Sequence, residues 1–454
     1  LLEDLNRTEK DRRTLVVERF EDFLTRYPDA SYTSHVRFRL AELYFEIASE
    51  NWLAASAEYY RKIDEVDEDD LEALEELDSL EEPKIALDKI IEMYDAIIAE
   101  NIDLPKEDWY EHLDGVYYML GYCYYEPNAT SADIEFHEDR IKKSVDVYQE
   151  LVDSMPDSHL ADQAHLMLGN ALFDDNRFET AIAEYQFVFD KGEEGMFYVD
   201  AMYQLAWAQY KLSEYDSALT LFTKLLDHSK QMKLDTGKES DYAKDAITYM
   251  AHSFADIAEH DDITAAAMVA ETFFAKDMPR EHEWDVYKAL AEVLIQYQRT
   301  EEAVECYKKL QNDPRWINNS ENPEFQMQVV TLLGTGLFAD LAAAGAERLE
   351  LTLRYNEGGE WWVANRSNPD ALNLARSYIE SSLLQVAVEF RVRAQESKEP
   401  ADFKLAADKY KEYLDKFPIS DDYYKQQWFL ADSYAQAQMY AEGEAEFSAL
   451  IESQ

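Results

Sequence analysis

Apolar residues recur along this chain at the spacing of an amphipathic helix, with short polar interruptions. The clearest unit covers residues 164–188. In its first half, Leu168 and Leu172 share one helical face, and after the polar turn Asp175-Asn176-Arg177 the same spacing resumes from Phe178. The pattern predicts two helices joined by a tight turn.

The same arrangement recurs along the chain, with a large apolar residue before Gly or Ala in the first helix and a small residue plus aromatic residues in the second. It is repeated at Leu205, Ala206, Tyr215, Ala218, Phe222 and Leu225; at Leu290, Ala291, Leu294, Ala303, Tyr307 and Leu310; and at Leu430, Ala431, Tyr434, Tyr440, Gly443, Phe447 and Leu450. First-helix matches alone lie at Leu40-Ala41, Leu120-Gly121, Met250-Ala251 and Leu333-Gly334. Such recurrence predicts a stack of hairpins in which each unit packs on its neighbours.

This pattern resembles the tetratricopeptide repeat family, whose helix-turn-helix unit has roughly 34 residues with the same large-then-small pair. Second helices that end at Pro28, Pro156 and Pro418 also resemble the family, because proline cannot continue a helix. The spacing departs from the family, since Leu168 and Leu205 are 37 residues apart. The resemblance covers most of 10–310 and 400–454. It implies an all-α fold, a right-handed α-solenoid of helical hairpins.

We therefore predict one continuous superhelix over residues 1–454, divided into four parts. These are N-terminal units over 10–125 with an acidic insertion at 64–83, regular central repeats over 132–311, a divergent helical segment over 312–400 with an irregular loop at 342–370, and C-terminal repeats over 400–454.

The joints at three prolines share a finer pattern. They read Arg26-Tyr27-Pro28-Asp29-Ala30-Ser31-Tyr32, Met155-Pro156-Asp157-Ser158-His159-Leu160 and Phe417-Pro418-Ile419-Ser420. Proline ends one helix, and Asp or Ser can cap the next by accepting from its free N–H groups. Such joints resemble those of bacterial cell-envelope repeat proteins, such as outer-membrane assembly lipoproteins and gliding or secretion accessory proteins. The resemblance implies a location in the periplasm or cell envelope of a bacterium, with a cytoplasmic location as the alternative.

The charge balance restricts the choice of partners. The chain has 43 Lys and Arg against 95 Asp and Glu, a formal net charge of −52. A field of this sign repels nucleic acid and anionic lipid surfaces, and the aromatic residues lack the basic face that nucleic-acid readers need. We therefore exclude nucleic acid as a partner and expect basic or apolar segments of other proteins. Adaptation to a high-salt habitat is an alternative reason for the acidity.

Apolar runs and cysteines set two further limits. No run of about 18 apolar residues is present, so we expect no direct membrane span. The chain begins at Leu1 without Met and already in a helical pattern, so any signal peptide or lipid anchor would be missing from it. Cys123 and Cys306 lie far apart inside apolar patterns, and we expect both to be small buried residues without a disulfide framework.

Two segments depart from the repeat. Residues 64–82 hold twelve acidic residues and no basic one, which fits a solvated acidic helix, a partly disordered insertion or a docking site for a basic partner. A calcium loop is disfavoured there because the run has no glycine. Within 342–370, Trp361 and Trp362 follow Gly358-Gly359, which predicts an irregular loop that can present aromatic surface to a partner. We favour the alternative, in which one or both Trp fold into the core.

Catalytic motifs are absent from the sequence. The nine His are scattered and form neither an H-E-x-x-H motif nor another spacing typical of metal ligands. There is no Gly-rich phosphate loop and no G-x-S-x-G elbow, and carboxylates are so abundant that close pairs carry no weight. We therefore predict a protein that is no enzyme, with no catalytic residues, no metal site and no cofactor.

The resemblance also implies where a partner binds, because first helices line the concave groove of such solenoids. Transferring the frame residue by residue places these side chains in the groove: Phe38, Phe45, Tyr118, Tyr122, Tyr125, Asn170, Phe173, Tyr203, Trp207, Tyr210 and Tyr249. Tyr and Trp suit a binding surface, and packing against the neighbouring helix is the alternative for each. The family's clamp for a C-terminal carboxylate is incomplete here. Asn170 fills its Asn slot, but the positions of its basic residues hold Gln163, Asp200, Asp245 and Asp285.

Together these observations predict a non-enzymatic scaffold or adaptor of a bacterial envelope-associated multiprotein complex, and membership of a large assembly. Two alternatives stay open. One is an accessory superhelical domain of a larger cell-wall-acting enzyme. The other is a cytoplasmic co-chaperone or regulator, which the incomplete clamp disfavours.

Overall fold

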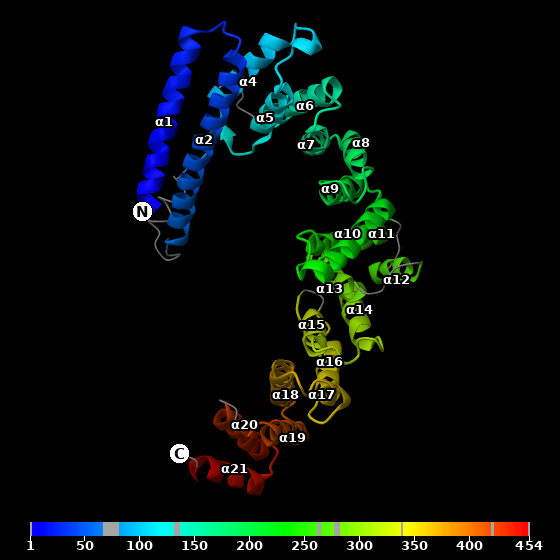
Figure 1. The fold of residues 1–454 in the computed structure, drawn as a ribbon. Coiled ribbons are helices and arrows are strands. Elements are labelled where there is room, and N and C mark those ends of the chain that lie inside the picture. The colour runs from blue at the N-terminus through cyan, green and yellow to red at the C-terminus, as the bar shows by residue number, and fades with distance from the viewer. Residues whose placement is uncertain are drawn as a thin grey trace. The chain divides into compact units, whose positions relative to one another are not determined.

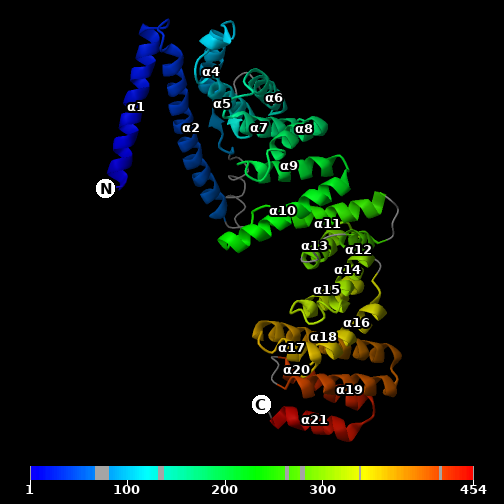
Figure 2. The same ribbon diagram turned by 45° about the vertical axis from the view of Figure 1, so that its right-hand side comes forward.

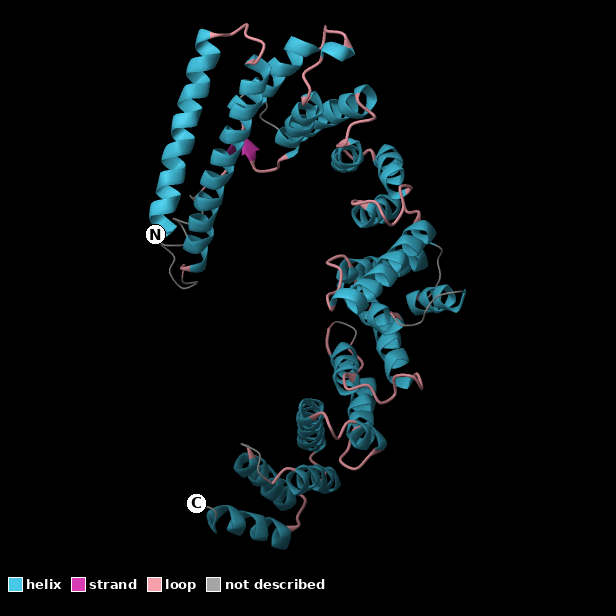
Figure 3. Cartoon of the chain, in the orientation of Figure 1, coloured by secondary structure: helices cyan, strands magenta, loops and turns pink. Residues whose placement is uncertain are grey.

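The computed structural model of the chain describes residues 2–66, 81–130, 137–260, 265–276, 282–336, 339–418 and 422–452. These residues are α-helical almost throughout, and among them one pair of two-residue strands is present (Figure 3). Most of the described helices pack mainly on the helices next to them in the chain, and α11 packs mainly on α13. The predicted fold class, an all-α solenoid of helical hairpins, is confirmed.

Contacts group the chain into two compact units, Leu1–Tyr242 and Ala243–Gln454. Unit 1 contains α1 (Leu2–Arg26), α2 (Thr33–Asp64), β1 (Ile85–Ala86), α4 (Asp88–Asn101), the short 3-10 helix η1 (Lys106–Asp108), α5 (Leu113–Tyr125), β2 (Ala129–Thr130), α6 (His137–Ser154), α7 (Ala161–Asp174), α8 (Phe178–Phe189), α9 (Tyr198–Lys211) and α10 (Tyr215–Thr236). Unit 2 contains α11 (Ala243–His260), α12 (Ala266–Lys276), α13 (Glu283–Gln296), α14 (Thr300–Asn312), α15 (Asn322–Gly334), α16 (Leu341–Arg354), α17 (Glu360–Ala364), α18 (Pro369–Ser397), α19 (Pro400–Lys416), α20 (Tyr423–Gln436) and α21 (Tyr440–Glu452). The continuous superhelix predicted over 1–454 and its division into four parts stay predictions.

Unit 1 begins with a hairpin of two long helices, α1 and α2, which lie side by side (Figure 1). Arg13 on α1 donates to Glu50 on α2 at 2.6 Å. Further along, the parallel strands β1 and β2 pair, and the Ile85 N–H donates to the Asn128 carbonyl at 2.8 Å. This pairing fastens the segment before α4 to the segment after α5 and satisfies backbone groups that a loop would leave to water.

The four repeats with both helices predicted are the hairpins α7–α8, α9–α10, α13–α14 and α20–α21. Each turn contains one residue in the left-handed region, with φ of 60° or 61°: Asn176, Ser213, Gln298 and Gln438. In the first turn, the Asn176 N–H donates to the Phe173 carbonyl at 2.9 Å and the Arg177 N–H to the Leu172 carbonyl at 2.8 Å. These bonds satisfy carbonyls that the end of a helix leaves free, so one local geometry closes all four hairpins.

Glycine is required where the helices of a hairpin approach most closely. A Cβ on Gly169 would lie 2.5 Å from Cε1 of Tyr185, and a Cβ on Gly121 would lie 2.7 Å from Cζ of Tyr148. Both Tyr rings are fully buried. The large-then-small pairs in the sequence therefore mark two of the places where a first helix touches its second helix.

In unit 2, helices α18 to α21 form a stack in which each helix contacts the next (Figure 2). Helix α18 begins at Pro369, directly after Asn368, whose side chain accepts from the Ala371 N–H at 3.2 Å. It ends at Ser397, the following Lys398 has a left-handed backbone with φ of 58°, and Pro400 then starts α19. A side-chain cap and Pro in the first turn explain why the helix starts here.

The prediction of an irregular loop at 342–370 is wrong. Residues 341–354 form α16 and residues 360–364 form α17. The run of Ala after Asp340 is a strong helix former, and the Asp340 carboxylate caps it by accepting from the N–H groups of Ala342 and Ala343 at 3.1 and 2.9 Å. What remains of the loop between α16 and α17 is a short turn around Gly358, whose φ is +84°.

Trp361 lies in the core of unit 2, in agreement with the favoured alternative. Its side chain is 3% exposed, and its indole N–H donates to the Asn319 carbonyl at 2.7 Å. Its ring packs edge-on against Tyr355, with centroids 5.3 Å apart. The prediction of a surface contact is therefore wrong for Trp361. Trp362 is half-buried, and its contact with a partner stays a prediction.

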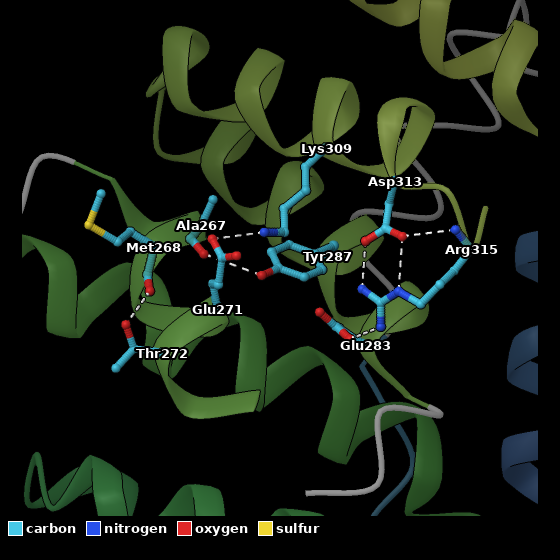
Figure 4. A network of polar contacts seen from close by, with 9 residues as sticks. All are labelled: Ala267, Met268, Glu271, Thr272, Glu283, Tyr287, Lys309, Asp313 and Arg315. Atoms are coloured by element: carbon cyan, nitrogen blue, oxygen red, sulfur yellow. Dashed lines mark hydrogen bonds and ion pairs between the residues drawn. The ribbon is translucent and has the colours of Figure 1, made fainter. Parts of the chain in front are cut away.

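A polar network joins α13 to the segment that follows α14 (Figure 4). Arg315 forms ion pairs with the buried Glu283 at 2.5 Å and with Asp313 at 2.6 Å. The side-chain hydrogen bond from Arg315 holds the pKa of Asp313 below its ordinary value. Lys309 and Glu271 form a neighbouring ion pair at 2.9 Å. Because removal of Arg315 would leave a buried carboxylate unpaired, this network holds the hairpin to the chain that follows it.

Several other sequence predictions can be compared with the fold. Cys123 and Cys306 are buried free thiols, as predicted. Most of the acidic insertion, residues 67–80, lies outside the described residues. Among the described helices, none has both the length and the apolar character of a membrane span. In the same parts of the chain, no three His, Cys, Asp or Glu side chains come together as a metal site needs.

Candidate functional site

All eleven predicted groove side chains are half-buried. Tyr249 lies on α11 of unit 2, whereas the other ten lie in unit 1. We call these ten the first-helix row: Phe38, Phe45, Tyr118, Tyr122, Tyr125, Asn170, Phe173, Tyr203, Trp207 and Tyr210. Half-burial fits both alternatives from the sequence, since each side chain packs on neighbours and keeps part of its surface accessible.

Helical periodicity explains this position. On α7, Leu168 and Leu172 are completely buried in the hairpin, while Asn170 and Phe173 project from adjacent faces and are half-buried. Residues three and four apart share a face of a helix, so the packing face is occupied by the large-then-small frame. The face beside it is left for the first-helix row.

The N-terminal part of the row lies on α2 and α5. Phe45 and Tyr122 meet edge-to-face with ring centroids 5.8 Å apart. Phe45 also lines a hollow of about 390 Å³ together with Phe20 and Met119. Phe38 is not part of this hollow, and its ring lies 6.1 Å from that of the buried Tyr94.

Five members of the row surround a second hollow in unit 1, with a volume of about 230 Å³. They come from three successive first helices, α5, α7 and α9, and are Tyr125, Asn170, Phe173, Tyr203 and Trp207. Asp174, Tyr185 and Gln204 complete the wall. We call this space the aromatic hollow.

Hydrogen bonds fix two parts of its wall. The Tyr125 hydroxyl donates to the Asp174 carboxylate at 2.8 Å, and the Tyr185 hydroxyl donates to the side-chain oxygen of Asn170 at 2.9 Å. Burial, followed by the hydrogen bond to Asp174, raises the pKa of Tyr125 above its ordinary value. Tyr125 is therefore a neutral donor throughout the physiological pH range.

Ring contacts extend this wall along α9. The ring of Trp207 lies 6.3 Å from Phe173 and 6.4 Å from Tyr203, edge-on in both cases. Tyr203 stacks on Tyr242 at 4.4 Å, and the Tyr242 hydroxyl donates to Asp200. These contacts restrict the rings, so the hollow exists without a partner and binding loses less conformational entropy.

The other predicted groove side chains, in the row and at Tyr249, do not line the aromatic hollow. Tyr118 accepts a hydrogen bond at 2.7 Å and Tyr122 donates one at 3.0 Å, both with polar side chains nearby. Tyr210 packs against a ring of α10 at 5.8 Å. Tyr249, in unit 2, lies 5.7 Å from the ring of His252. Their part in binding, like that of the rest of the row, stays a prediction.

Sequence reasoning misses three residues of the hollow: Asp174, Tyr185 and Gln204. Asp174 follows Phe173 and lies one helical turn after Asn170, so the repeat frame could have found it. In so acidic a chain, however, one more exposed carboxylate carries no signal. A hollow of about 390 Å³ in unit 2, lined by Trp362 and Arg376 among others, also has no signature in the repeat frame.

Comparison with known proteins bears on the fold. The family model of the tetratricopeptide repeat matches residues 200–229, which comprise most of α9 and the first part of α10. None of the curated proteins matches the chain. The fold therefore defines an all-α helical-repeat protein in which one hairpin matches the tetratricopeptide repeat.

Two solved structures are similar to the chain at low identity. One is a tetratricopeptide repeat protein from Parabacteroides merdae, with 12% identity and a TM-score of 0.30, and the match covers 72% of this chain and 99% of that chain. The other is the structure of Naa15/Naa10 bound to HypK-THB, with 13% identity and a TM-score of 0.33. That match covers 97% of this chain and 58% of that chain.

Proposed function

We propose that this chain is a non-enzymatic scaffold that binds segments of other proteins along the first-helix row, in a bacterial envelope-associated multiprotein complex. The observation that carries this proposal is the gathering of half-buried side chains from α5, α7 and α9 around the aromatic hollow. Tyr and Trp rings combine apolar area with a polar tip at a small cost in side-chain entropy, which suits the recognition of another chain.

The protonation behaviour of the row favours binding over acid–base catalysis. Burial raises the pKa of Tyr122 to about 12, and burial also raises the pKa of Tyr118. A general acid or base works best when its pKa lies near the working pH. These hydroxyls are therefore suited to directional hydrogen bonds with a partner.

The partners proposed for this row are basic or apolar segments. A net charge of −52 attracts basic chains and repels acidic ones. The clamp positions Gln163 and Asp200 also offer no positive charge to a C-terminal carboxylate. This disfavours the alternative of a co-chaperone that grips acidic tails.

The envelope location is proposed from the proline joints. Pro28 and Pro156 lie two residues after the ends of α1 and α6. Proline at this place prevents either helix from continuing. The Asp or Ser caps expected from the sequence do not form at these joints, because α2 and α7 begin after Tyr32 and Leu160 without a side-chain cap.

The double variant Tyr203→Ala/Trp207→Ala tests the proposal. Partners are crosslinked to the tagged chain in its native cells, recovered from separated envelope and cytosolic fractions, and identified by mass spectrometry. We expect the main partner to come from the envelope fraction and its yield to fall about tenfold or more in the variant, because buried aromatic anchors carry much of an interface's energy. The far-UV circular dichroism should not change.

The matched control is Phe187→Ala/Leu234→Ala, which removes two exposed apolar side chains from second helices of the same unit. It should leave the crosslinks unchanged. Crosslinks that persist in the Tyr203→Ala/Trp207→Ala variant would show that the first-helix row is not the binding surface. A main partner found in the cytosolic fraction would contradict the envelope location.

A further inference from the structure

The carboxylate of Asp174 forms part of the wall of the aromatic hollow and can accept further hydrogen bonds. Asp174 is the last residue of α7 and is exposed. Among the described residues, it accepts one hydrogen bond, from Tyr125, and forms no ion pair. An ionised carboxylate has roughly four acceptor positions, so Asp174 can accept further bonds from a donor outside the chain.

Basic side chains are divided unequally between first and second helices around the hollow. The first helices α5, α7 and α9 carry four carboxylates and a single basic residue, Lys211. The second helices α6, α8 and α10 carry ten carboxylates, so both groups of helices are net negative, but they also carry six basic residues: Arg140, Lys142, Lys143, Lys224, Lys230 and Lys233. The hollow lies among the first helices, where Lys211 is the single Lys or Arg, so few fixed cations compete there with a cationic ligand.

The remaining carboxylates of these first helices already have partners. Asp114 accepts from the Ser158 hydroxyl at 2.6 Å, and Asp162 pairs with Lys191 at 3.2 Å. Asp200 accepts from the Tyr242 hydroxyl. Asp174 is thus the carboxylate of this group that faces the hollow with capacity to spare.

Aromatic faces line the same space. Tyr125, Phe173, Tyr203 and Trp207 come from three helices, and the π-face of each ring attracts a cation. The protein already contains one such contact, because the Lys211 ammonium lies 5.5 Å from the centre of the Trp207 ring. A hollow of about 230 Å³ is smaller than the pockets of at least roughly 300 Å³ that hold drug-sized ligands, so it suits one side chain.

The end of α7 adds to the preference for positive charge. Phe173 and Asp174 are its last two residues, and the aligned peptide dipoles give the C-terminus of a helix a partial negative charge. The carboxylate, the helix end and the ring faces therefore all favour the same kind of group.

We propose that the aromatic hollow receives one cationic side chain, Arg or Lys, from a partner protein, with Asp174 as its counter-ion and Trp207 and Tyr203 as stacking faces. This rests on the proposed function and names the chemistry that a partner brings to it. Arg fits the arrangement especially well, because a planar guanidinium can stack on a ring while its N–H groups donate to a carboxylate.

Saturation-transfer NMR with the whole chain tests the proposal. The probe is N-acetyl-arginine-N-methylamide, and its neutral isostere is the citrulline analogue. We expect the wild-type protein to transfer saturation to the arginine probe in excess of the citrulline probe. Asp174→Asn should lower this excess about two- to fivefold, since it removes the counter-ion and keeps an acceptor for Tyr125.

Two further variants distinguish binding in the hollow from a general attraction of the arginine probe to an acidic chain. Asp227→Asn removes an exposed carboxylate from the second helix α10 and should leave the arginine signal at its wild-type level. Trp207→Leu keeps an apolar side chain but loses the ring face, and it should lower the signal as Asp174→Asn does. If Asp174→Asn and Asp227→Asn behave alike, the probe only follows the net charge and the proposal is overturned.

The outcome for the proposed function can be read separately. One result is that native crosslinks are lost in the Tyr203→Ala/Trp207→Ala variant while the arginine signal is the same with and without the Asp174 carboxylate. This result would support the proposed scaffold function and contradict the cation site. The opposite result is an arginine signal that depends on Asp174 and native crosslinks that do not change when the first-helix row is mutated. It would support the cation site and contradict the proposed scaffold function.

Discussion

At the scale of single residues, the contact between Gly169 and Tyr185 links the packing of a hairpin to the candidate site. The Tyr185 ring fills the space that a side chain at position 169 would occupy, and its hydroxyl donates to Asn170 at 2.9 Å. Asn170, which follows Gly169 on α7, lines the aromatic hollow. Any change that pushes the ring also moves a wall of the hollow.

Replacement of Gly169 by Ala should therefore be costly. The added Cβ would lie 2.5 Å from Cε1 of Tyr185, which is fully buried and cannot move away without losing its hydrogen bond. We expect a loss of about 1–3 kcal/mol in the free energy of unfolding, measured by urea denaturation.

Gly115→Ala is the matched control on α5, because its Cβ would lie 3.6 Å from the Phe38 ring, an ordinary contact. It should change the free energy of unfolding little. Equal effects at positions 115 and 169 would show that the close approach to Tyr185 does not limit the packing of this hairpin.

At the scale of elements, the recurring unit is a hairpin closed by one left-handed residue. Three of the four turns place a residue other than Gly or Asn there: Ser213, Gln298 and Gln438. A side chain in this conformation costs roughly 1–2 kcal/mol per residue because Cβ crowds the following carbonyl oxygen. The turns form nonetheless because the backbone bonds and the packing of both helices determine them.

This strain leads to a stabilising substitution. Gln298 is exposed, so its replacement by Gly removes the strain without loss of packing. We expect Gln298→Gly to raise the free energy of unfolding by about 0.5–1 kcal/mol, because part of the gain is offset by the greater freedom of Gly in the unfolded chain. Thermal unfolding followed by circular dichroism measures the effect.

Asn176→Gly provides the comparison in the turn between α7 and α8. Asn tolerates the left-handed region better than Gln does, so its replacement should gain less. A lower melting temperature for Gln298→Gly would mean that this position is not strained.

The sequence was sufficient for those hairpins in which both halves keep the frame. Leu168 and Gly169, with the polar turn at 175–177, predict α7 and α8 because packing and turn are both local. The sequence-based prediction failed at 342–370, because the Gly and Trp residues were given more weight than the run of helix-forming Ala. The half-buried faces were predictable from periodicity. The aromatic hollow was not, because it depends on which side chains of three helices meet.

At the scale of the whole molecule, the excess of carboxylates is a global property. With 95 acidic against 43 basic residues, most carboxylates lack a cation of their own. Mutual repulsion of like charges destabilises a compact chain, and dissolved salt screens it. The scarcity of basic residues on α5, α7 and α9 is the local expression of the same imbalance.

Salt should therefore stabilise the protein. The Debye length falls from about 10 Å at 0.1 M to about 3 Å at 1 M ionic strength, so repulsion between neighbouring carboxylates weakens over this range. We expect the melting temperature to rise when sodium chloride is increased from low to molar concentration. Potassium chloride should act alike, because screening does not depend on the kind of monovalent cation.

A melting temperature that stays constant or falls would show that ion pairs between opposite charges outweigh the repulsion. A rise that continues into the molar range would favour the high-salt alternative for the acidity. A rise that levels off at lower concentration would leave basic partners as its better explanation.

The shared turn geometry also has an evolutionary consequence. A hairpin whose closure is determined within its own few residues can be duplicated in the gene and fold in its new place without changes elsewhere. Differences in length should then accumulate between hairpins, where nothing local resists an insertion. The 37-residue distance between Leu168 and Leu205 fits this view, because the turns after α7 and α9 have the same length and the linker between α8 and α9 accommodates the extra residues.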